Sequence, residues 1–315
     1  MAARLAAPEL LASPAGRHVR RVEPVLLGGH PYLLAQIDAD AATVAPVLHR
    51  LGASSEAFEH HGALDGREGP FLRPLGAAEA GPLPRKLAEA RRYKGKTSEV
   101  FTRVLLNLAV FAGTHADAAR LRVVDPLAGG GTTLFVALAA GHDAFGLERT
   151  RRDVETTATF VRQFCRESGI PHRELRGAKG ERRFTFELGP RDEPRTLVVA
   201  EGDACKADEE LRTVPGGARF HALAADLPYG IQHRAEPVAL LSEALPVWER
   251  MLVPGGALAV SWDATRMPRD RLVACVRDAC GLAVRDDPPY DALAHRVDRV
   301  IKERDVVVAT KAVSA

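Results

Sequence analysis

A glycine turn between apolar segments is the feature of this sequence that most constrains its fold. Residues 121–148 read LRVVDPLAGGGTTLFVALAAGHDAFGLE, which is the pattern of a strand, a glycine-rich turn, a helix and a second strand. A strand that enters a helix through such a turn begins a βαβ unit, whose two strands lie parallel in one sheet. The chain is therefore predicted to contain an α/β sheet.

Further strands alternate with helical segments along the rest of the chain. They are predicted in TLVVAEGDA, FHALAADLPYG and GALAVSWDA, and two more are predicted within residues 282–310. This alternation predicts a doubly wound, mostly parallel sheet with helices on its faces. Residues 170–194 are too long for a simple connection between a helix and a strand, so we expect a charged insertion with a short hairpin there.

The first 80 residues have a different pattern. The segment VEPVLLGGHPYLLAQID places Gly28 and Gly29 between two apolar runs, which predicts a hairpin, and ADAATVAPVLHRLG has helical spacing. The stretch AAEAGPLP that follows is typical of a linker. We expect a small N-terminal α/β unit over residues 1–82 and the main domain over residues 83–315, which opens with a helix after Thr97 or Ser98.

Composition narrows the cellular setting. The formal net charge is only +2, so any nucleic-acid binding must use local basic patches. The 4 cysteines include no CxxC pair, which is typical of small apolar residues in a reducing compartment. Glu9 interrupts the apolar start of the chain, which argues against a signal peptide, although a transit peptide stays open. We expect a cytoplasmic protein with a loosely ordered N-terminus.

The glycine turn also predicts a ligand site. Such a turn brings backbone N–H groups and a helix N-terminus close to a ligand, and an acidic residue after the next strand commonly binds ribose hydroxyls. Glu148 lies 17 residues after Gly131, near the spacing of about 20 in dinucleotide-binding folds. A nicotinamide dehydrogenase is one alternative, but its third glycine is missing and Asp125 would repel a pyrophosphate. The carboxylate of Asp125 favours a cationic cofactor, S-adenosylmethionine (SAM).

The segment DPLAGGGTTLFVALAAGHDAFGLE resembles motif I and the following acidic strand of class I SAM-dependent methyltransferases. It is especially similar to the enzymes that methylate amino nitrogens of nucleic-acid bases, in which serine is common at the position of Gly130. The resemblance extends over roughly residues 85–310. It implies a Rossmann-like fold with a mostly parallel seven-stranded sheet, and SAM as the cofactor.

Two segments compete for the catalytic motif of that family, which reads DPPY. Residues 287–290 match it perfectly, and residues 226–229 read DLPY. The catalytic loop of the family follows the fourth strand, where DLPY lies, whereas the perfect match comes after the fifth strand. We therefore predict that the DLPY segment is the site and that the DPPY segment is not.

The resemblance assigns roles to the DLPY loop. Asp226 and the backbone carbonyl of Leu227 would accept hydrogen bonds from an exocyclic amine and orient its lone pair, next to Pro228, while Tyr229 would stack on the base. Other residues match cofactor contacts. An ordinary helix cap explains Thr97 and Ser98 equally well and is an alternative for Asp203. The full set implied for cofactor binding is Thr97, Ser98, Asp125, Pro126, Gly129, Gly131, Thr132, Glu148, Asp203 and Ala204.

The acceptor is predicted to be RNA. The segments DLPYG and RYKGKTSEVFTRVLLNLA look closer to RNA methylases associated with THUMP domains and to tRNA guanosine-N2 methyltransferases than to DNA methylases. Residues 85–103 are rich in basic side chains that could bind phosphates: Arg85, Lys86, Arg91, Arg92, Lys94, Lys96 and Arg103. Four further arginines could extend this basic surface: Arg182, Arg183, Arg296 and Arg299. Such a run also occurs on ordinary solvated helices.

Alternative functions stay open at this point. The chain could methylate adenine N6 or cytosine N4 in DNA, or an amine of a protein or a small molecule. It could also be a binding module that keeps the fold without turnover. Methyl transfer of this type needs no metal, and we interpret His60 and His61 as a surface pair.

Overall fold

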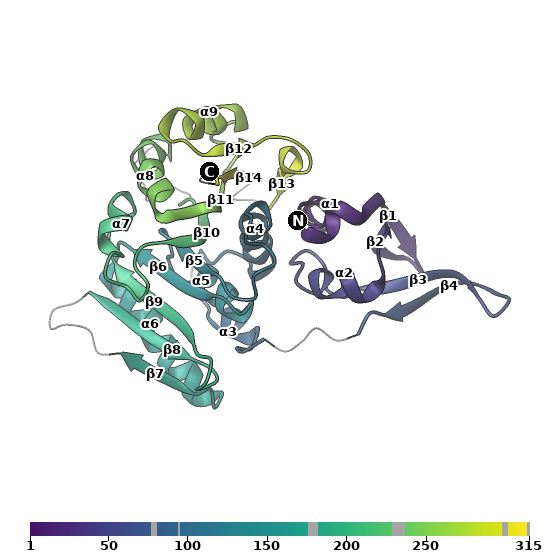
Figure 1. Ribbon diagram of the computed structural model, residues 1–315, viewed down its shortest axis with the longest axis horizontal. Coiled ribbons are helices and arrows are strands. Elements are labelled where there is room, and N and C mark those ends of the chain that lie inside the picture. Colours follow the sequence, from purple (N-terminus) through teal and green to yellow (C-terminus); the bar gives the residue numbers. More distant parts are fainter. Residues whose placement is uncertain (77–80, 94, 176–181, 229–236, 298–301, 314–315) are drawn as a thin grey trace.

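The computed structural model describes residues 1–76, 81–93, 95–175, 182–228, 237–297 and 302–313. One large sheet with helices on both faces forms the centre of this described part (Figure 1). In the order in which they lie side by side, its strands are β12 (Ala283–Arg285), β14 (Glu303–Thr310), β11 (Leu252–Asp263), β10 (Phe220–Asp226), β5 (Arg122–Asp125), β6 (Asp143–Glu148), β9 (Arg195–Glu201), β8 (Arg183–Leu188) and β7 (His172–Leu175). A short strand, β13 (His295–Arg296), pairs with β14 outside this row.

The predicted α/β fold is confirmed, but the sheet is mixed and wider than the seven strands expected. Strands β11, β10, β5, β6 and β9 run parallel to their neighbours in this group. Strand β14 lies antiparallel between β11 and β12. The insertion after the helix at residues 151–167 forms the predicted hairpin, β7 and β8, which pairs antiparallel with β9 and so extends the sheet.

Alternation along the strands divides the core into two layers. Val123 packs in one cluster and Val124 in the other, because successive side chains of a strand point to opposite faces. One face is covered by α4 (Glu99–Ala112), α5 (Thr132–Ala139) and α6 (Arg151–Glu167), and the other by α7 (Ala207–Glu210), α8 (Pro237–Met251) and α9 (Arg269–Ala279). Short helical turns complete the domain: α3 (Lys86–Ala90), η2 (Ala204–Lys206) and η3 (Tyr290–Ala292).

The strand order reverses between β5 and β10. From β5 the chain moves outward through β6 to β9, then returns to the other side of β5 for β10. Open α/β sheets bind their ligands beyond the carboxyl ends of the strands at such a switch point. Asp125 ends β5 and Asp226 ends β10, so the two predicted site residues lie at this position.

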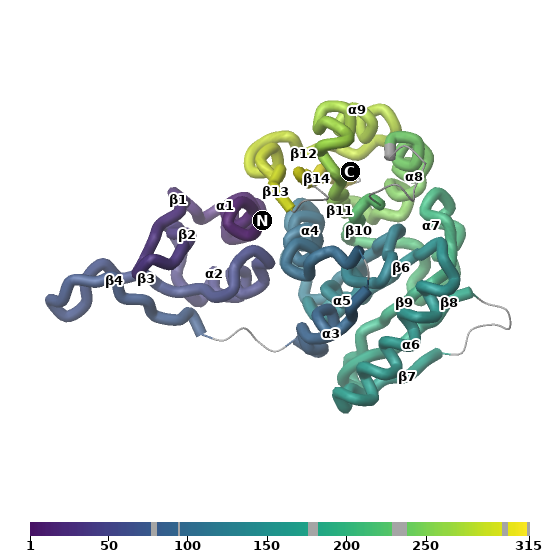
Figure 2. Tube along the Cα trace, turned by 180° about the vertical axis from the view of Figure 1, so that it is seen from behind, coloured from purple at the N-terminus to yellow at the C-terminus, as the bar shows by residue number. Residues whose placement is uncertain are grey.

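The N-terminal elements lie beside α4, as both views show (Figures 1 and 2). The predicted hairpin is confirmed, because Gly28 and Gly29 take φ values of 58° and 83° in the turn between its strands. A second hairpin, which we did not predict, follows it. The elements are α1 (Ala2–Ala12), η1 (Pro14–His18), β1 (Val19–Leu27), β2 (His30–Ile37), α2 (Ala41–Leu48), β3 (Phe58–Leu64) and β4 (Arg67–Pro74).

The expectation of a loosely ordered N-terminus is wrong. Residues 2–12 form α1, which packs on α4 through buried leucines. Glu9, which seemed to interrupt the apolar segment, is fully buried and accepts hydrogen bonds from the backbone N–H groups of Gly52 (2.7 Å) and Ala53 (2.8 Å) and from Asn107 Nδ2 (2.7 Å). These partners satisfy the buried carboxyl group. They come from distant segments, so the sequence around Glu9 does not reveal them.

Candidate active site

The glycine turn lies between the end of β5 and the start of α5. Gly129 and Gly131 have φ values of 50° and 87°, in the left-handed region that favours glycine. Gly131 directly precedes Thr132, the first residue of α5, so the turn presents backbone and a helix N-terminus at the carboxyl edge of the sheet. Thr132 and Pro126 are buried within the turn.

Asp125 lies beneath this turn with only 2% of its surface exposed. Its Oδ1 accepts a hydrogen bond of 2.9 Å from the backbone N–H of Leu127. Burial raises the pKa of Asp125 to about 7; hydrogen bonds from Thr133 and Leu127 act against this, and the negative charges of Asp226 and Glu148 add to it. The carboxyl groups of the edge therefore repel one another, and a cation placed among them would be stabilised.

The next two acidic residues follow the ends of neighbouring strands at the same edge. Glu148 ends β6, and its Oε1 accepts a hydrogen bond of 2.7 Å from the backbone N–H of Thr150. Asp203 follows β9 and is exposed; its Oδ1 accepts a hydrogen bond of 3.0 Å from the backbone N–H of Cys205 and so caps η2. Ala204 is buried and its carbonyl accepts a hydrogen bond from Trp248.

A tyrosine ring lies on the glycine turn. Tyr93 donates or accepts a hydrogen bond of 2.6 Å with Thr132 Oγ1. A Cβ atom at Gly130 would lie 2.3 Å from Cζ of this ring, which is far inside contact distance. The absence of a side chain at Gly130 therefore makes room for Tyr93. The guanidinium of Arg91 lies 5.6 Å from the ring centroid and contacts its face.

Asp226 is held by three side chains, one from β11, one from β14 and one from the segment before α4. Its Oδ2 accepts a hydrogen bond of 2.6 Å from Thr97 Oγ1, and its Oδ1 accepts a hydrogen bond from the hydroxyl of Ser261. Arg304 Nη2 lies 3.8 Å from Oδ2. Burial raises the pKa of Asp226, and Arg304, Ser261 and Thr97 act in the opposite direction. The carboxylate is thus fixed at the end of β10.

The rest of the DLPY segment continues from this point. Leu227 is buried, and its backbone N–H donates a hydrogen bond of 2.9 Å to the carbonyl of Ser261. Pro228 is exposed. Tyr229 lies outside the described residues.

The two residues predicted before α4 have different surroundings. Ser98 is the N-cap residue of α4, and its carbonyl accepts hydrogen bonds from the backbone N–H (2.9 Å) and the hydroxyl (3.0 Å) of Thr102. Thr97 reaches across to Asp226. The segment before α4 therefore contacts the carboxyl end of β10.

The second motif is a structural turn. Tyr290 is 3% exposed and packs in the core, with the guanidinium of Arg285 4.6 Å from its ring centroid. Asp287 forms an ion pair of 3.0 Å with Arg285, and this contact holds the pKa of Asp287 below its ordinary value. The ring of Tyr290 is not available to stack on a base.

Several cations of the segment at residues 85–103 have partners within the protein. Arg85 donates to the carbonyl of His49 (3.1 Å) and Arg91 to that of Thr156 (3.2 Å). Lys96 donates to the carbonyl of Ala88 (2.7 Å) and forms an ion pair with Glu99. Lys86 and Arg92 are exposed, whereas Lys94 lies outside the described residues.

The other basic residues named above have similar surroundings. Arg182 forms an ion pair of 3.4 Å with Glu201, and Arg183 donates to Thr213 Oγ1 (2.7 Å). Arg296 is exposed, and Arg299 lies outside the described residues. Of the cations with partners, Arg91 is buried and Lys96 and Arg183 are half-buried, whereas Arg85 and Arg182 stay exposed.

Sequence reasoning missed Ser261 and Arg304. Ser261 is the one polar residue within the apolar stretch ALAVSW of β11, and a buried hydroxyl requires a partner, so a signal was present. Arg304 lies between Glu303 and Asp305 at the charged start of β14, which gives no such signal. Its approach to Asp226 depends on β14 lying antiparallel beside β11, with Arg304 opposite Asp263.

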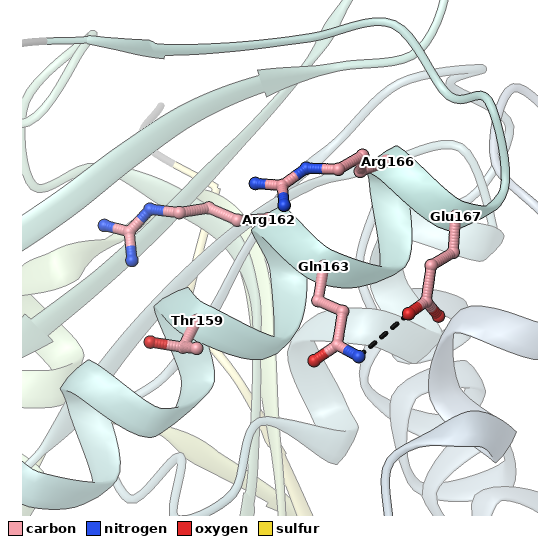
Figure 3. Close-up of a pocket in the computed structure, with 5 residues that line it drawn as sticks. All are labelled: Thr159, Arg162, Gln163, Arg166 and Glu167. Atoms are coloured by element: carbon pink, nitrogen blue, oxygen red, sulfur yellow. Dashed lines mark hydrogen bonds between the residues drawn. The ribbon is translucent and has the colours of Figure 1, made fainter.

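A shallow depression lies elsewhere, on the surface of α6 (Figure 3). It is lined by side chains of this one helix: Thr159, Arg162, Gln163, Arg166 and Glu167. Arg162 forms an ion pair with Glu174 and Gln163 donates a hydrogen bond to Glu167, so these side chains are already engaged in contacts at the protein surface.

In the described ranges, no group of three or more histidine, cysteine or acidic residues is arranged to hold a metal ion. No described helix is both long and apolar enough to cross a membrane.

Neither a protein-family model nor a curated protein matches the sequence. Solved structures similar to the chain include TrmN from Thermus thermophilus, with 21% identity and a TM-score of 0.43 over 76% of this chain and 54% of TrmN. A TehB-like SAM-dependent methyltransferase from Corynebacterium glutamicum has 15% identity and a TM-score of 0.37 over 62% of this chain and 83% of its own. The N-methyltransferase NodS from Bradyrhizobium japonicum has 13% identity and a TM-score of 0.40 over 67% of this chain and 94% of NodS. The chain thus spans about half the length of TrmN.

Proposed function

We propose that this chain is a class I SAM-dependent methyltransferase that methylates an exocyclic amino nitrogen of a nucleic-acid base. The observation that carries the proposal is the position of Asp226. Its carboxylate lies at the switch point of the sheet, at the end of β10, and is electrostatically coupled to Asp125 beneath the glycine turn of the adjacent strand. This arrangement supports a cofactor site and an acceptor site that meet at one edge of the sheet.

The charge of the edge fits this cofactor. Asp125, Glu148 and Asp203 follow three neighbouring strands, and the negative charges of Asp226 and Glu148 raise the pKa of Asp125. A pyrophosphate would add to this repulsion, whereas a sulfonium and an ammonium group would relieve it. When bound, SAM supplies a methyl group whose bond to sulfur breaks with the electron pair remaining on sulfur.

The residues of the chain have separate roles in this proposal. The glycine turn and Glu148 would hold the nucleoside part of the cofactor, with Asp203 and Ala204 at the adenine, and Thr97 and Ser98 would close over the amino-acid part. The complete sets are Thr97, Ser98, Asp125, Pro126, Gly129, Gly131, Thr132, Glu148, Asp203 and Ala204 for the cofactor, and Asp226, Leu227, Pro228 and Tyr229 for catalysis.

Asp226 would act on the acceptor amine. The lone pair of an exocyclic amine is delocalised into its ring, which makes the nitrogen a poor nucleophile. A carboxylate that accepts its N–H fixes the direction of the lone pair and stabilises the positive charge that develops on nitrogen. The nitrogen contributes both electrons of the new bond and then loses a proton, which in this scheme the Asp226 carboxylate would accept.

We propose RNA as the acceptor, with guanosine N2 in tRNA or rRNA as the first candidate. The resemblance of the DLPYG and KTSEVFTRV segments supports this choice, and the exposed Lys86, Arg92 and Arg296 offer phosphate contacts. Since several other cations have partners within the protein, their contribution to RNA binding is modest. We further propose that residues 1–82 act as an accessory unit to a catalytic domain of residues 83–315, in the cytoplasm.

The test is transfer of labelled methyl groups from SAM to total tRNA, rRNA and duplex DNA. Wild type is compared with Asp226→Ala and with the matched control Asp287→Ala. Label in an RNA fraction that disappears only with Asp226→Ala supports the proposal, and nucleoside analysis then identifies the base. Label in DNA alone moves the acceptor to adenine or cytosine. Absence of transfer to every nucleic acid, with SAM binding measured by calorimetry, overturns the nucleic-acid acceptor and points to a protein or small-molecule amine.

A further inference from the structure

We infer that Ser261 and Arg304 are positioning residues that fix the Asp226 carboxylate for its work on the acceptor amine. The inference rests on the proposed function, since it assigns this work to Asp226. Both residues belong to strands of the sheet rather than to the loops around the site: Ser261 to β11 and Arg304 to β14.

Ser261 holds the catalytic loop at two points. Its position in the parallel register is opposite Asp226, and its hydroxyl donates to Oδ1 of that residue. Its carbonyl accepts a hydrogen bond of 2.9 Å from the backbone N–H of Leu227. Ser261 thus binds both the side chain of Asp226 and the backbone of Leu227. Ser261 is fully buried, so this arrangement does not compete with solvent.

Arg304 provides the positive charge of the site. Arg304 is 5% exposed, and its Nη2 lies 3.8 Å from Oδ2 of Asp226. The same guanidinium lies 4.6 Å from the ring centroid of Phe101 on α4, which fixes it from the side of the helix. A buried ion pair contributes little net stability, but removal of either partner leaves an uncompensated charge. The pair is better explained by the geometry that it imposes on Asp226.

The carboxylate keeps room for the acceptor. A carboxylate offers about four acceptor positions, and the hydroxyls of Ser261 and Thr97 take one on each oxygen. Ser261 holds Asp226 from within the sheet, while Thr97 approaches from the segment before α4. Further capacity on these oxygens suits an N–H group of the acceptor.

Charge around Asp226 makes the role of Arg304 measurable. Burial raises the pKa of Asp226 and Arg304 from β14 lowers it, while the charges of Asp226 and of Glu148 on β6 both act on Asp125 on β5. Loss of the positive charge removes the strongest influence that favours ionised Asp226. The pKa of Asp226 then rises further, so a rate that requires the carboxylate reaches its plateau at higher pH.

The experiment compares wild type with Arg304→Gln, Arg304→Lys and Ser261→Ala, and uses Arg195→Gln as a control for loss of a buried arginine far from Asp226. The pH profile of kcat/KM for methyl transfer and calorimetric SAM affinity are measured. We expect Arg304→Gln to move the acidic limb to higher pH, Arg304→Lys to restore it, and Ser261→Ala to lower kcat roughly 10- to 100-fold with SAM affinity unchanged.

A second measurement does not need activity. The Asp226 carboxyl carbon is titrated by NMR in protein with labelled aspartate, with the signal assigned by Asp226→Asn. An upward shift of its pKa in Arg304→Gln, absent in Arg195→Gln, supports the inference even if the acceptor differs from the one proposed. If the titration and the acidic limb of Arg304→Gln coincide with those of wild type, the inference is overturned. If wild type transfers no methyl group, the proposed function fails instead, and the titration alone decides the inference.

Discussion

Residues 226–229 and 287–290 differ at a single letter, Leu227 against Pro288, yet they lie in unlike surroundings. The first segment follows a central parallel strand at the switch point, and its aspartate meets Thr97, Ser261 and Arg304. The second follows β12 near the edge of the sheet, and its tyrosine is buried while its aspartate pairs with Arg285 at the surface. Position in the sheet, rather than completeness of the motif, distinguishes a candidate site from a turn.

The largest expected effect is on activity. Replacement of Asp226 by alanine is expected to lower kcat about 10²- to 10³-fold, because it removes a fixed charge that acts on the transition state. Asp287→Ala is expected to leave kcat within about twofold, since an exposed ion pair contributes only ~0.5 kcal/mol. Initial rates of methyl transfer, measured with thermal melting curves of both variants, check this. An equal loss of kcat in Asp226→Ala and Asp287→Ala would contradict the prediction that only the first segment takes part in catalysis.

The second effect is on stability, and it reverses the comparison. Tyr290→Ala is expected to lower the free energy of unfolding by about 3–5 kcal/mol, because it empties a core position that is only 3% exposed. Tyr290→Phe keeps the ring and serves as the control. Urea unfolding gives the free energy of unfolding of both variants. Folded Tyr290→Phe is expected to have the kcat of wild type. A loss of kcat in stable Tyr290→Phe would mean that the DPPY segment takes part in catalysis.

The third effect follows from completing the motif. Leu227→Pro converts DLPY into DPPY, but it removes the N–H that donates to Ser261 and replaces a buried leucine. We expect a loss of about 2–4 kcal/mol in unfolding free energy, since an unmade buried hydrogen bond adds to the lost packing. Leu227→Ala keeps the N–H and separates the two causes in urea unfolding. A stable, fully active Leu227→Pro would show that the motif alone determines the site.

The smallest effect is a difference in pH dependence. The pKa of Asp287 is lowered, so its contribution to stability is present above the ordinary pKa of aspartate and is lost as the pH falls through its folded value. The pKa of Asp226 is raised, so its contribution is present below the ordinary value and is lost as the pH rises through its folded value.

Unfolding free energies of wild type, Asp226→Asn and Asp287→Asn between about pH 3 and pH 7 test this difference. Relative to wild type, Asp287→Asn should become less stable as the pH rises, whereas Asp226→Asn should become more stable. Parallel curves for the two variants would mean that their surroundings do not differ in the way described.

Local sequence patterns predicted the parts of the molecule that depend on local structure. The glycine turn at residues 129–131, the hairpin at Gly28 and Gly29 and the start of α4 after Ser98 follow from backbone preferences of a few residues. In the large sheet the alternation of strands and helices followed from apolar periodicity, whereas α1 and the second N-terminal hairpin, β3 and β4, were not predicted. The width of the sheet could not be predicted in this way. The inserted hairpin could have formed a separate two-stranded sheet, but β8 pairs with β9 and so extends the central sheet.

The sequence predicted the residues of the candidate site that lie within recognisable motifs, but not the residues that contact them from other strands. Asp125 and Asp226 end apolar strands, and that position is visible in the sequence. The contacts that set their ionisation are not, because Arg304 is brought to Asp226 by strand pairing between segments far apart in the chain. The same reason explains Glu9, whose partners Gly52 and Asn107 lie on other elements.

The place of β14 in the sheet has a consequence for the order in which the protein is made. This strand follows the other strands in the chain, yet it is inserted between β11 and β12 and carries Arg304 toward the middle of the edge. A ribosome synthesises β10 and β11 first, so Asp226 and Ser261 leave the exit tunnel before their counter-charge exists. The contact between Asp226 and Arg304 can therefore form only after β14 has been synthesised, and a nascent chain halted before β14 would have the carboxylate of Asp226 without the guanidinium that lies beside it.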